Sequence, residues 1–191
     1  MKKGVMIWIG IGVVVLLLVF WVIGSYNRFV SLEQGINGKW SEVESQYQRQ
    51  ADLIPNLISI VSSSVNVETK FVKDVVSART SWASASTQLA KDTAGQQMNN
   101  GISAFVSAVA ENYPVLQANM QYRALTDELS GTQNRITTAR GRYIEVIQSY
   151  NTATKRFPAN VLAGVFGFSG KEYYTSDSGT TTPSLGTGVL P

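Results

Sequence analysis

The chain has 191 residues, contains neither cysteine nor histidine, and carries a formal net charge of +3. The two missing residue types exclude disulfides, thiolate chemistry, imidazole bases and the usual zinc, haem and di-iron ligand sets. Charged residues make up 15% of the chain, against about 25% in ordinary soluble domains. Uncharged polar side chains must therefore cover much of the surface, and such a surface repels copies of itself only weakly.

The run from Val5 to Ile23 contains no charge, no proline and no strongly polar side chain. As a helix that rises about 1.5 Å per residue, it would be roughly 28 Å long, close to the thickness of the hydrocarbon core of a bilayer. Trp8, Trp21 and Tyr26 lie near its two ends, where aromatic rings favour the membrane interface. We expect residues 1–24 to form an uncleaved transmembrane anchor.

A cleaved secretory signal is the alternative for this segment, because Lys2 and Lys3 provide a basic region ahead of it. However, the apolar run is longer than in most signals, and no A-x-A cleavage site follows it. The flanking charges are nearly balanced, since Arg28 and Lys39 follow the run. The α-amine and the close lysine pair favour a cytoplasmic N-terminus, which would place the rest of the chain outside the cytoplasm.

Helical periodicity dominates the sequence after the anchor. From Phe29 to Val61 the apolar residues recur every three or four positions, which predicts a long helix that can continue directly from the membrane span. Three glycines between residues 24 and 38 permit a bend outside the bilayer. Pro55 predicts a kink, because it removes an amide donor and crowds the carbonyl of Ala51. The serine-rich stretch at 62–66 predicts a turn.

Two shorter helices and a last long helix follow in the sequence. The second helix starts at Glu68 and ends at Asp92 to Gly95, where Gly95 would provide a left-handed cap. The third helix covers Met98 to Val109 and stops before Pro114. The last helix, from Tyr122 to Phe157, keeps a three-four alternation over five heptads, as a coiled-coil-like bundle helix does.

The end of the chain changes in composition. The apolar segment from Val161 to Phe168 is expected to fold back over the end of the bundle, and residues 175–191, rich in serine, threonine, glycine and proline, form a flexible tail. No stretch alternates polar and apolar residues over a convincing length, so we predict an all-α domain over residues 25–174 and no sheet.

Short motifs in a fixed order are similar to those of the LemA family of membrane-anchored helical proteins. They are Tyr26-Asn27, Trp40, Asp52 to Leu57, Ala78-Arg79, Ala110 to Pro114, Leu116, Ala118-Asn119, Asn134 to Ile136, Ala139-Arg140, Tyr143, Tyr150-Asn151, Phe157-Pro158, Asn160 and Phe166 to Phe168. The sequence departs from the family pattern at Val67, Gln133 and Ile144, where the family tends to have histidine, glutamate and asparagine. The resemblance implies an antiparallel four-helix bundle on a single-pass anchor, no established reaction, and association with membrane proteases or other envelope proteins.

Motifs for catalysis and metal binding are missing or incomplete. The sequence has no S-x-x-K or G-x-S-x-G motif, and the glycines near Lys171 do not have the spacing of a phosphate-binding loop. Glu42 and Glu44 would face different sides of a helix, as would Asp127 and Glu128. We predict no catalytic, cofactor-binding or metal-ligating residue, although a cation site made only of carboxylates between helices stays open as an alternative.

Several polar residues lie on or beside the apolar stripes, namely Asn56, Arg79, Arg135, Arg140 and Asn151. We expect their side chains to bond to neighbouring helices and so to fix the register of the bundle, with acids such as Asp52 or Glu111 as partners. The specific hypothesis is that Arg135 or Arg140 pairs with an acid on a neighbouring helix. In the rival interpretation, the arginines and these two acids line the pocket of a membrane-bound enzyme or ligand-binding protein.

These observations favour a non-enzymatic, membrane-anchored bundle that acts as a scaffold or adaptor and associates with copies of itself. Fourteen basic and thirteen acidic residues follow the anchor, so no basic surplus exists for binding nucleic acid. The expected partners are the lipid bilayer, further copies of the chain and, through the resemblance, membrane proteases or other envelope proteins.

Overall fold

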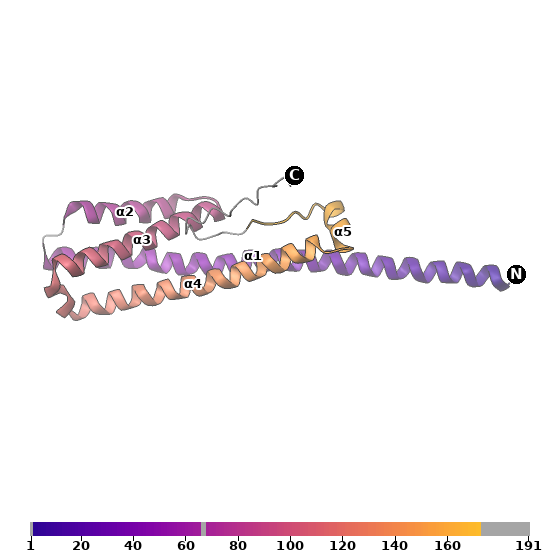
Figure 1. Cartoon of the computed structure of the whole chain (residues 1–191), viewed down its shortest axis with the longest axis horizontal. Coiled ribbons are helices and arrows are strands. Elements are labelled where there is room, and N and C mark those ends of the chain that lie inside the picture. Colours follow the sequence, from indigo (N-terminus) through magenta and orange to yellow (C-terminus); the bar gives the residue numbers. More distant parts are fainter. Residues whose placement is uncertain (1, 66–67, 173–191) are drawn as a thin grey trace, which may run out of the picture.

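The computed structural model describes residues 2–65 and 68–172. All regular elements within these ranges are helical, which confirms the all-α prediction. In chain order they are α1 (Lys2–Ser64), α2 (Thr69–Ser84), α3 (Gln88–Asn112), the short 3-10 helix η1 (Pro114–Ala118), α4 (Met120–Lys155) and α5 (Ala159–Phe166). Successive long helices run in opposite directions, and α4 returns alongside α1 (Figure 1). The predicted tail, residues 175–191, lies outside the described residues.

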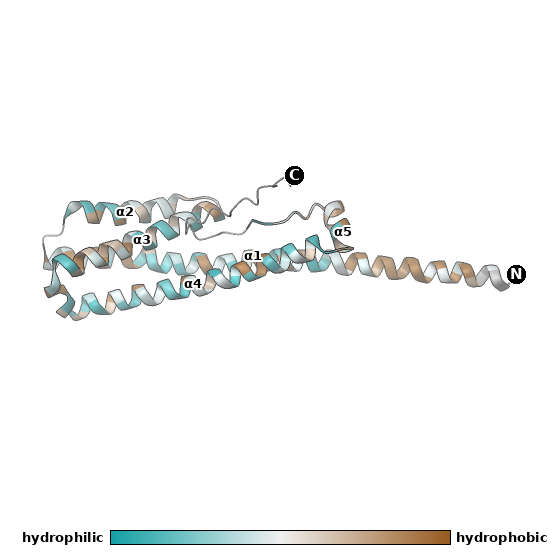
Figure 2. Ribbon diagram, viewed as in Figure 1, coloured by the Kyte–Doolittle hydropathy of each residue, from teal (hydrophilic) through white to brown (hydrophobic). Residues whose placement is uncertain are grey.

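The apolar run and the first bundle helix form one uninterrupted helix, α1, of 63 residues. Apart from half-buried Val22, the large side chains from Met6 to Ile23 are exposed, and α1 is the one described helix that is long and apolar enough to cross a membrane. Figure 2 shows this apolar part projecting beyond the other helices. No break occurs at the glycines outside the apolar run, so the part of α1 suited to a bilayer continues directly into the bundle.

Helix α1 also continues through Pro55 and ends where the sequence predicts a turn. In its last turn, the hydroxyls of Ser63 and Ser64 both donate to the carbonyl of Ile60, at 3.0 and 2.9 Å. Serine side chains compete in this way with backbone donors and favour helix ends. The predicted turn after Val61 is therefore close to the observed end of the helix.

The predicted boundary between the second and third helices is wrong. Helix α2 ends at Ser84, and α3 starts at Gln88 and passes through the segment from Asp92 to Gly95. The hydroxyl of Thr87 accepts the amide of Ala90 at 3.1 Å and caps α3, as threonine commonly does at helix starts. Gly95 is not a cap but a point of close contact inside α3, described below.

The core lies along the inner faces of α1 to α4. Helix α1 packs mainly against α4, and α2 packs mainly against α3. Trp40 and Tyr143 join the first pair with ring centroids 5.5 Å apart, while Tyr47 reaches Trp82 of α2 at 6.5 Å. The periodic apolar residues of the predicted helices, such as Ile54, Phe105 and Ile136, are almost completely buried.

The C-terminal apolar segment folds back on the bundle, as predicted. Helix α5 buries Ala163 against Phe29 of α1 and Ala153 of α4. The ring of Phe168 lies 5.2 Å from that of Phe29 and 5.6 Å from that of Tyr26. This contact lies where α1 leaves the bundle on its way to the N-terminus (Figure 1).

Candidate functional site

A buried polar cluster centres on Asp92 of α3, which is 2% exposed. Its Oδ2 atom lies 2.9 Å from Nη2 of Arg140 on α4 and accepts the side-chain amide of Gln96 at 3.0 Å. Its Oδ1 atom accepts the hydroxyl of Tyr47 on α1 at 3.4 Å. Asp92 therefore connects three helices. The hypothesis that Arg140 pairs with an acid on a neighbouring helix is confirmed. The acid is Asp92, which was expected at the end of a helix.

Gly95 makes room for this cluster. A Cβ atom at position 95 would lie 2.6 Å from ring carbons of Tyr47, a separation at which atoms overlap. The ring of Tyr47 can therefore lie directly on the α3 backbone and bring its hydroxyl to Asp92, one turn earlier in the helix. Glycine is needed here for close packing between helices and not for a turn.

Burial dominates the electrostatics of the cluster. It raises the pKa of Asp92 above the ordinary value of 3.8, although the charge of Arg140 and the hydrogen bonds oppose this effect. Burial also raises the pKa of Tyr47, with a further contribution from the charge of Asp92. Moving the Asp92 carboxylate out of water thus costs more free energy than its interaction with Arg140 provides, which is common for buried ion pairs.

Three further contacts extend the polar region. Lys91 pairs with Glu44 of α1 and its ammonium lies 5.5 Å from the ring centroid of Trp82. The hydroxyl of Tyr143 donates to the side-chain oxygen of Gln88 at 3.4 Å. The polar residues of this region hold α1, α3 and α4 to one another.

Arg79 stabilises the backbone around Pro55. A proline inside a helix leaves the carbonyl four residues earlier without its amide donor, and here that carbonyl belongs to Ala51. The Nε atom of Arg79, on α2, donates to the Ala51 carbonyl at 3.0 Å. Pro55 and Arg79 both stand out in the sequence, and the structure shows that Arg79 supplies the donor that Pro55 lacks.

Arg135 pairs with an acid on its own helix and not, as the hypothesis allowed, with one on a neighbouring helix. Its guanidinium lies 3.2 Å from Glu128 on the same helix, α4. Glu128 also pairs with Arg49 of α1 at 2.7 Å. The hydrogen bond from Arg135 is the main cause that lowers the pKa of Glu128, followed by the charge of Arg49. These side chains are at least one-third exposed, so their pairing adds little to stability.

Asn151 is a second buried polar residue that joins separate segments of the chain. Its amide nitrogen donates to the carbonyl of Lys171 and its oxygen accepts the Lys171 amide, both at 2.8 Å. The ammonium of Lys171 in turn lies 2.7 Å from Glu33 of α1. These contacts fix the segment after α5 along the α1 and α4 pair.

The remaining candidates are on the surface. Asp52 is exposed and accepts the side-chain amide of Gln48 at 2.8 Å, Glu111 is exposed, and Asn56 lines a surface groove. The structure does not bring the three arginines together with Asp52 and Glu111 into one pocket. Over residues 2–65 and 68–172, no three carboxylates gather into a group that could hold a metal ion.

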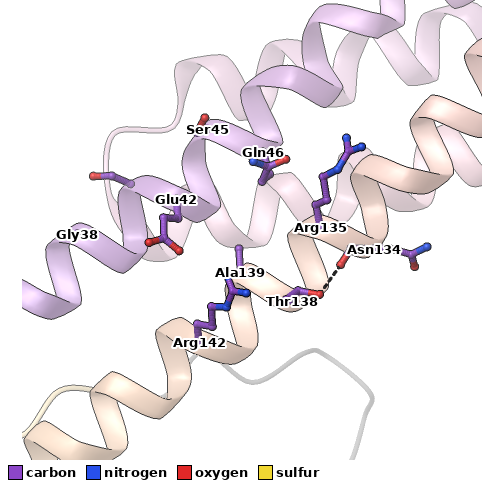
Figure 3. Close-up of a pocket in the computed structure, with 10 residues that line it drawn as sticks. Gly38, Glu42, Ser45, Gln46, Asn134, Arg135, Thr138, Ala139 and Arg142 are labelled. Carbon is purple, nitrogen blue, oxygen red and sulfur yellow. Dashed lines mark hydrogen bonds between the residues drawn. The ribbon is translucent and has the colours of Figure 1, made fainter.

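A surface groove runs between α1 and α4 (Figure 3). Its residues are Gly38, Ser41, Glu42, Ser45 and Gln46 of α1 and Asn134, Arg135, Thr138, Ala139 and Arg142 of α4. Many of these side chains are small, and both signs of charge are present. The side-chain oxygen of Gln46 is buried and finds no hydrogen-bond partner within the described part of the chain. The groove offers shape and polarity for contact with another helix.

Neither the core position of Asp92 nor the groove was predicted from the sequence, for different reasons. The apolar positions of α3, continued toward its N-terminus, lead to Gly95 and then Asp92, so a longer periodic stripe would have revealed that Asp92 faces the core. The groove carried no such signal, because its residues are small or polar and come from two helices that are far apart in the sequence.

The chain resembles known proteins in sequence. Two relatives, magnetosome proteins MamQ 2 and MamQ 1 of Paramagnetospirillum magneticum, are each 26% identical to it over 195 aligned residues, which covers 87% of this chain and 72% of each relative. Magnetosome protein MamQ of Magnetospirillum gryphiswaldense is 24% identical over the same coverage. None of these names denotes an enzyme. The LemA family model matches residues 39–185, most of the chain, and the protein therefore belongs to the LemA family.

Proposed function

We propose that this protein is a single-pass, membrane-anchored scaffold or adaptor that acts through protein contacts and self-association, without catalysing a reaction. The observation that carries the proposal is the groove between α1 and α4. Its α1 side, residues 38–46, belongs to the same helix whose N-terminal part is exposed and apolar over a length suited to a bilayer. The anchor would confine the groove to the membrane plane, which raises the effective concentration of copies for weak contacts.

A second copy of the chain is the occupant that the groove favours. Its small residues allow a helix backbone to approach closely. Glu42 lies on its α1 side and Arg142 on its α4 side. In a twofold dimer, any contact between two different residues occurs twice, once in each direction. In the proposed dimer, Glu42 of each copy would face Arg142 of the other. A single surface with both charges can therefore be complementary to itself.

The membrane side and further partners belong to the same proposal. An extracytoplasmic bundle follows from the expected orientation of the anchor, and membrane proteases or other envelope proteins are the adaptor's proposed partners. The polar residues of the bundle interior support a structural role, because Arg79, Arg140 and Asn151 are each used in contacts between elements.

Charge exchange in native membranes tests the dimer. We expect Glu42→Arg and Arg142→Glu each to lower the fraction of chemically crosslinked dimer, by about tenfold if each costs roughly 1.4 kcal/mol. The double variant should restore the fraction, because each reversed charge again meets its opposite. Arg123→Glu, an exposed position on α4 that does not line the groove, is the matched control and should leave crosslinking unchanged. Equal effects of all three single variants, or no rescue by the double variant, would contradict this arrangement.

A further inference from the structure

The α4–α5 corner exposes an apolar face. Phe157 in the turn and Val161 and Val165 on α5 are spaced four residues apart and are 79%, 59% and 73% exposed. None of the eight residues of α5 is charged. The opposite face of α5 is already used, since Ala163 is buried against α1 and α4. A helix that buries one face in the bundle and leaves apolar residues on the other needs a second apolar environment.

The position of this corner indicates which environment that is. Phe157 and Pro158 line a surface pocket together with Trp21 and Ser25 of α1. Trp21 belongs to the last turn of the apolar run, where an aromatic ring suits the membrane interface. The corner therefore lies at the level where α1 would leave the bilayer, beside the exposed apolar part of α1 (Figure 1).

The charges around the corner fit the headgroup region of a membrane. Arg28 and Arg156 line the same pocket, which has no acidic residue among its lining side chains. Lys155 and Arg156 are exposed immediately before Phe157. Apolar side chains that sit beside cations, on a helix at the membrane surface, are the pattern by which interfacial helices bind lipid.

We propose that the α4–α5 corner inserts into the interface of the same bilayer that α1 spans. Phe157, Val161 and Val165 lie among the outer parts of the acyl chains, and Arg28, Lys155 and Arg156 face the lipid phosphates. This inference rests on the proposed anchoring of α1 and adds a second attachment. Two attachments fix the orientation of the bundle on the membrane, which a single helix does not.

Depth measurement on the full chain tests the inference. The natural chain has no cysteine, so single variants can be labelled cleanly with a small environment-sensitive fluorophore. The variants are Val161→Cys and Val165→Cys at the corner, Val115→Cys as an equally exposed apolar control in η1, and Leu17→Cys inside the apolar run. The probes are proteoliposomes of phosphatidylcholine and phosphatidylglycerol that carry a nitroxide either near the headgroup or at the end of an acyl chain.

We expect labels at 161 and 165 to be quenched most by the shallow nitroxide and to lie about 5–10 Å below the phosphates. The label at 17 should be quenched most by the deep nitroxide, and the label at 115 by neither. Quenching at 17 with none at 161 and 165 would overturn this inference and leave the anchor intact. Absence of quenching at 17 would overturn the anchor and this inference together. Circular dichroism establishes that each variant is folded.

Discussion

At the scale of single residues, Asp92 and Arg140 form the most consequential contact. The side chain of Asp92 is 3% exposed and that of Arg140 is 17% exposed. Burial raises the pKa of Asp92, so the folded protein holds this proton more tightly than the unfolded chain. The contribution of this group to stability is therefore complete below pH 3.8 and falls as the pH rises through the raised value.

Arg140→Met should lower the free energy of unfolding by about 3–5 kcal/mol at neutral pH, because it leaves a carboxylate buried without its cation. The loss should be smaller near pH 4, since a protonated carboxyl needs no counter-charge. Thermal unfolding in detergent, followed by circular dichroism at several pH values, measures both effects.

Two further variants define the cause. Adding Asp92→Leu to Arg140→Met should recover much of the loss, because the buried charge is then gone. Arg49→Met breaks the exposed pair with Glu128 and should change the free energy of unfolding little, because solvent screens such a pair. A loss for Arg140→Met that is independent of pH would show that side-chain packing, and not the buried charge, makes Arg140 important.

At the scale of elements, α1 and α3 show how contacts outside a helix decide its course. Pro55 would favour a break in α1, but Arg79 of α2 donates to the carbonyl that Pro55 leaves without a partner. Gly95 would favour a helix end, but α3 continues through it and the ring of Tyr47 packs on its backbone at that point. In both helices, a residue that usually marks a boundary is accommodated by a neighbouring element.

Two glycines of α3 provide a matched comparison. Gly95→Ala should destabilise the protein by about 1–3 kcal/mol, because its Cβ atom would overlap the ring of Tyr47. Gly101→Ala should be neutral or should stabilise it by up to about 1 kcal/mol, because alanine favours helix and its Cβ atom would lie 3.7 Å from that of Ala78, an ordinary contact. Chemical unfolding of the two variants measures the difference. If the two substitutions changed the free energy of unfolding equally, the ring of Tyr47 would have to move aside without loss of stability.

At the scale of the whole molecule, the apolar N-terminal segment and the bundle share one helix. Because α1 is continuous from Lys2 to Ser64, no linker separates the segment suited to a bilayer from the groove on α1 and α4. In the proposed anchoring, the direction of the membrane span would therefore determine how the groove is presented, and copies in one membrane would present it at a similar height. This arrangement supports assembly within the membrane plane.

The proposed tethering predicts how dimers respond to dilution. In proteoliposomes, the crosslinked fraction should fall when lipid is added at reconstitution, because the two-dimensional concentration falls. It should stay constant when finished proteoliposomes are diluted with buffer, since the protein-to-lipid ratio does not change. Crosslinking yield across the two series measures this. A yield that follows the bulk concentration would indicate contacts between separate vesicles instead.

The sequence alone determined that the chain is helical and that its N-terminal segment is apolar, because periodic burial is a local property of a chain. It did not determine where the second helix ends and the third begins. It also identified Arg140 and Asn151 as polar residues on apolar stripes. Their partners, Asp92 and the backbone of Lys171, were decided only by the tertiary structure, since residues 48 and 20 positions apart meet only once the helices pack. The same reason explains Gly95: a sequence shows that a side chain is missing, and only the packed neighbour shows what fills its place.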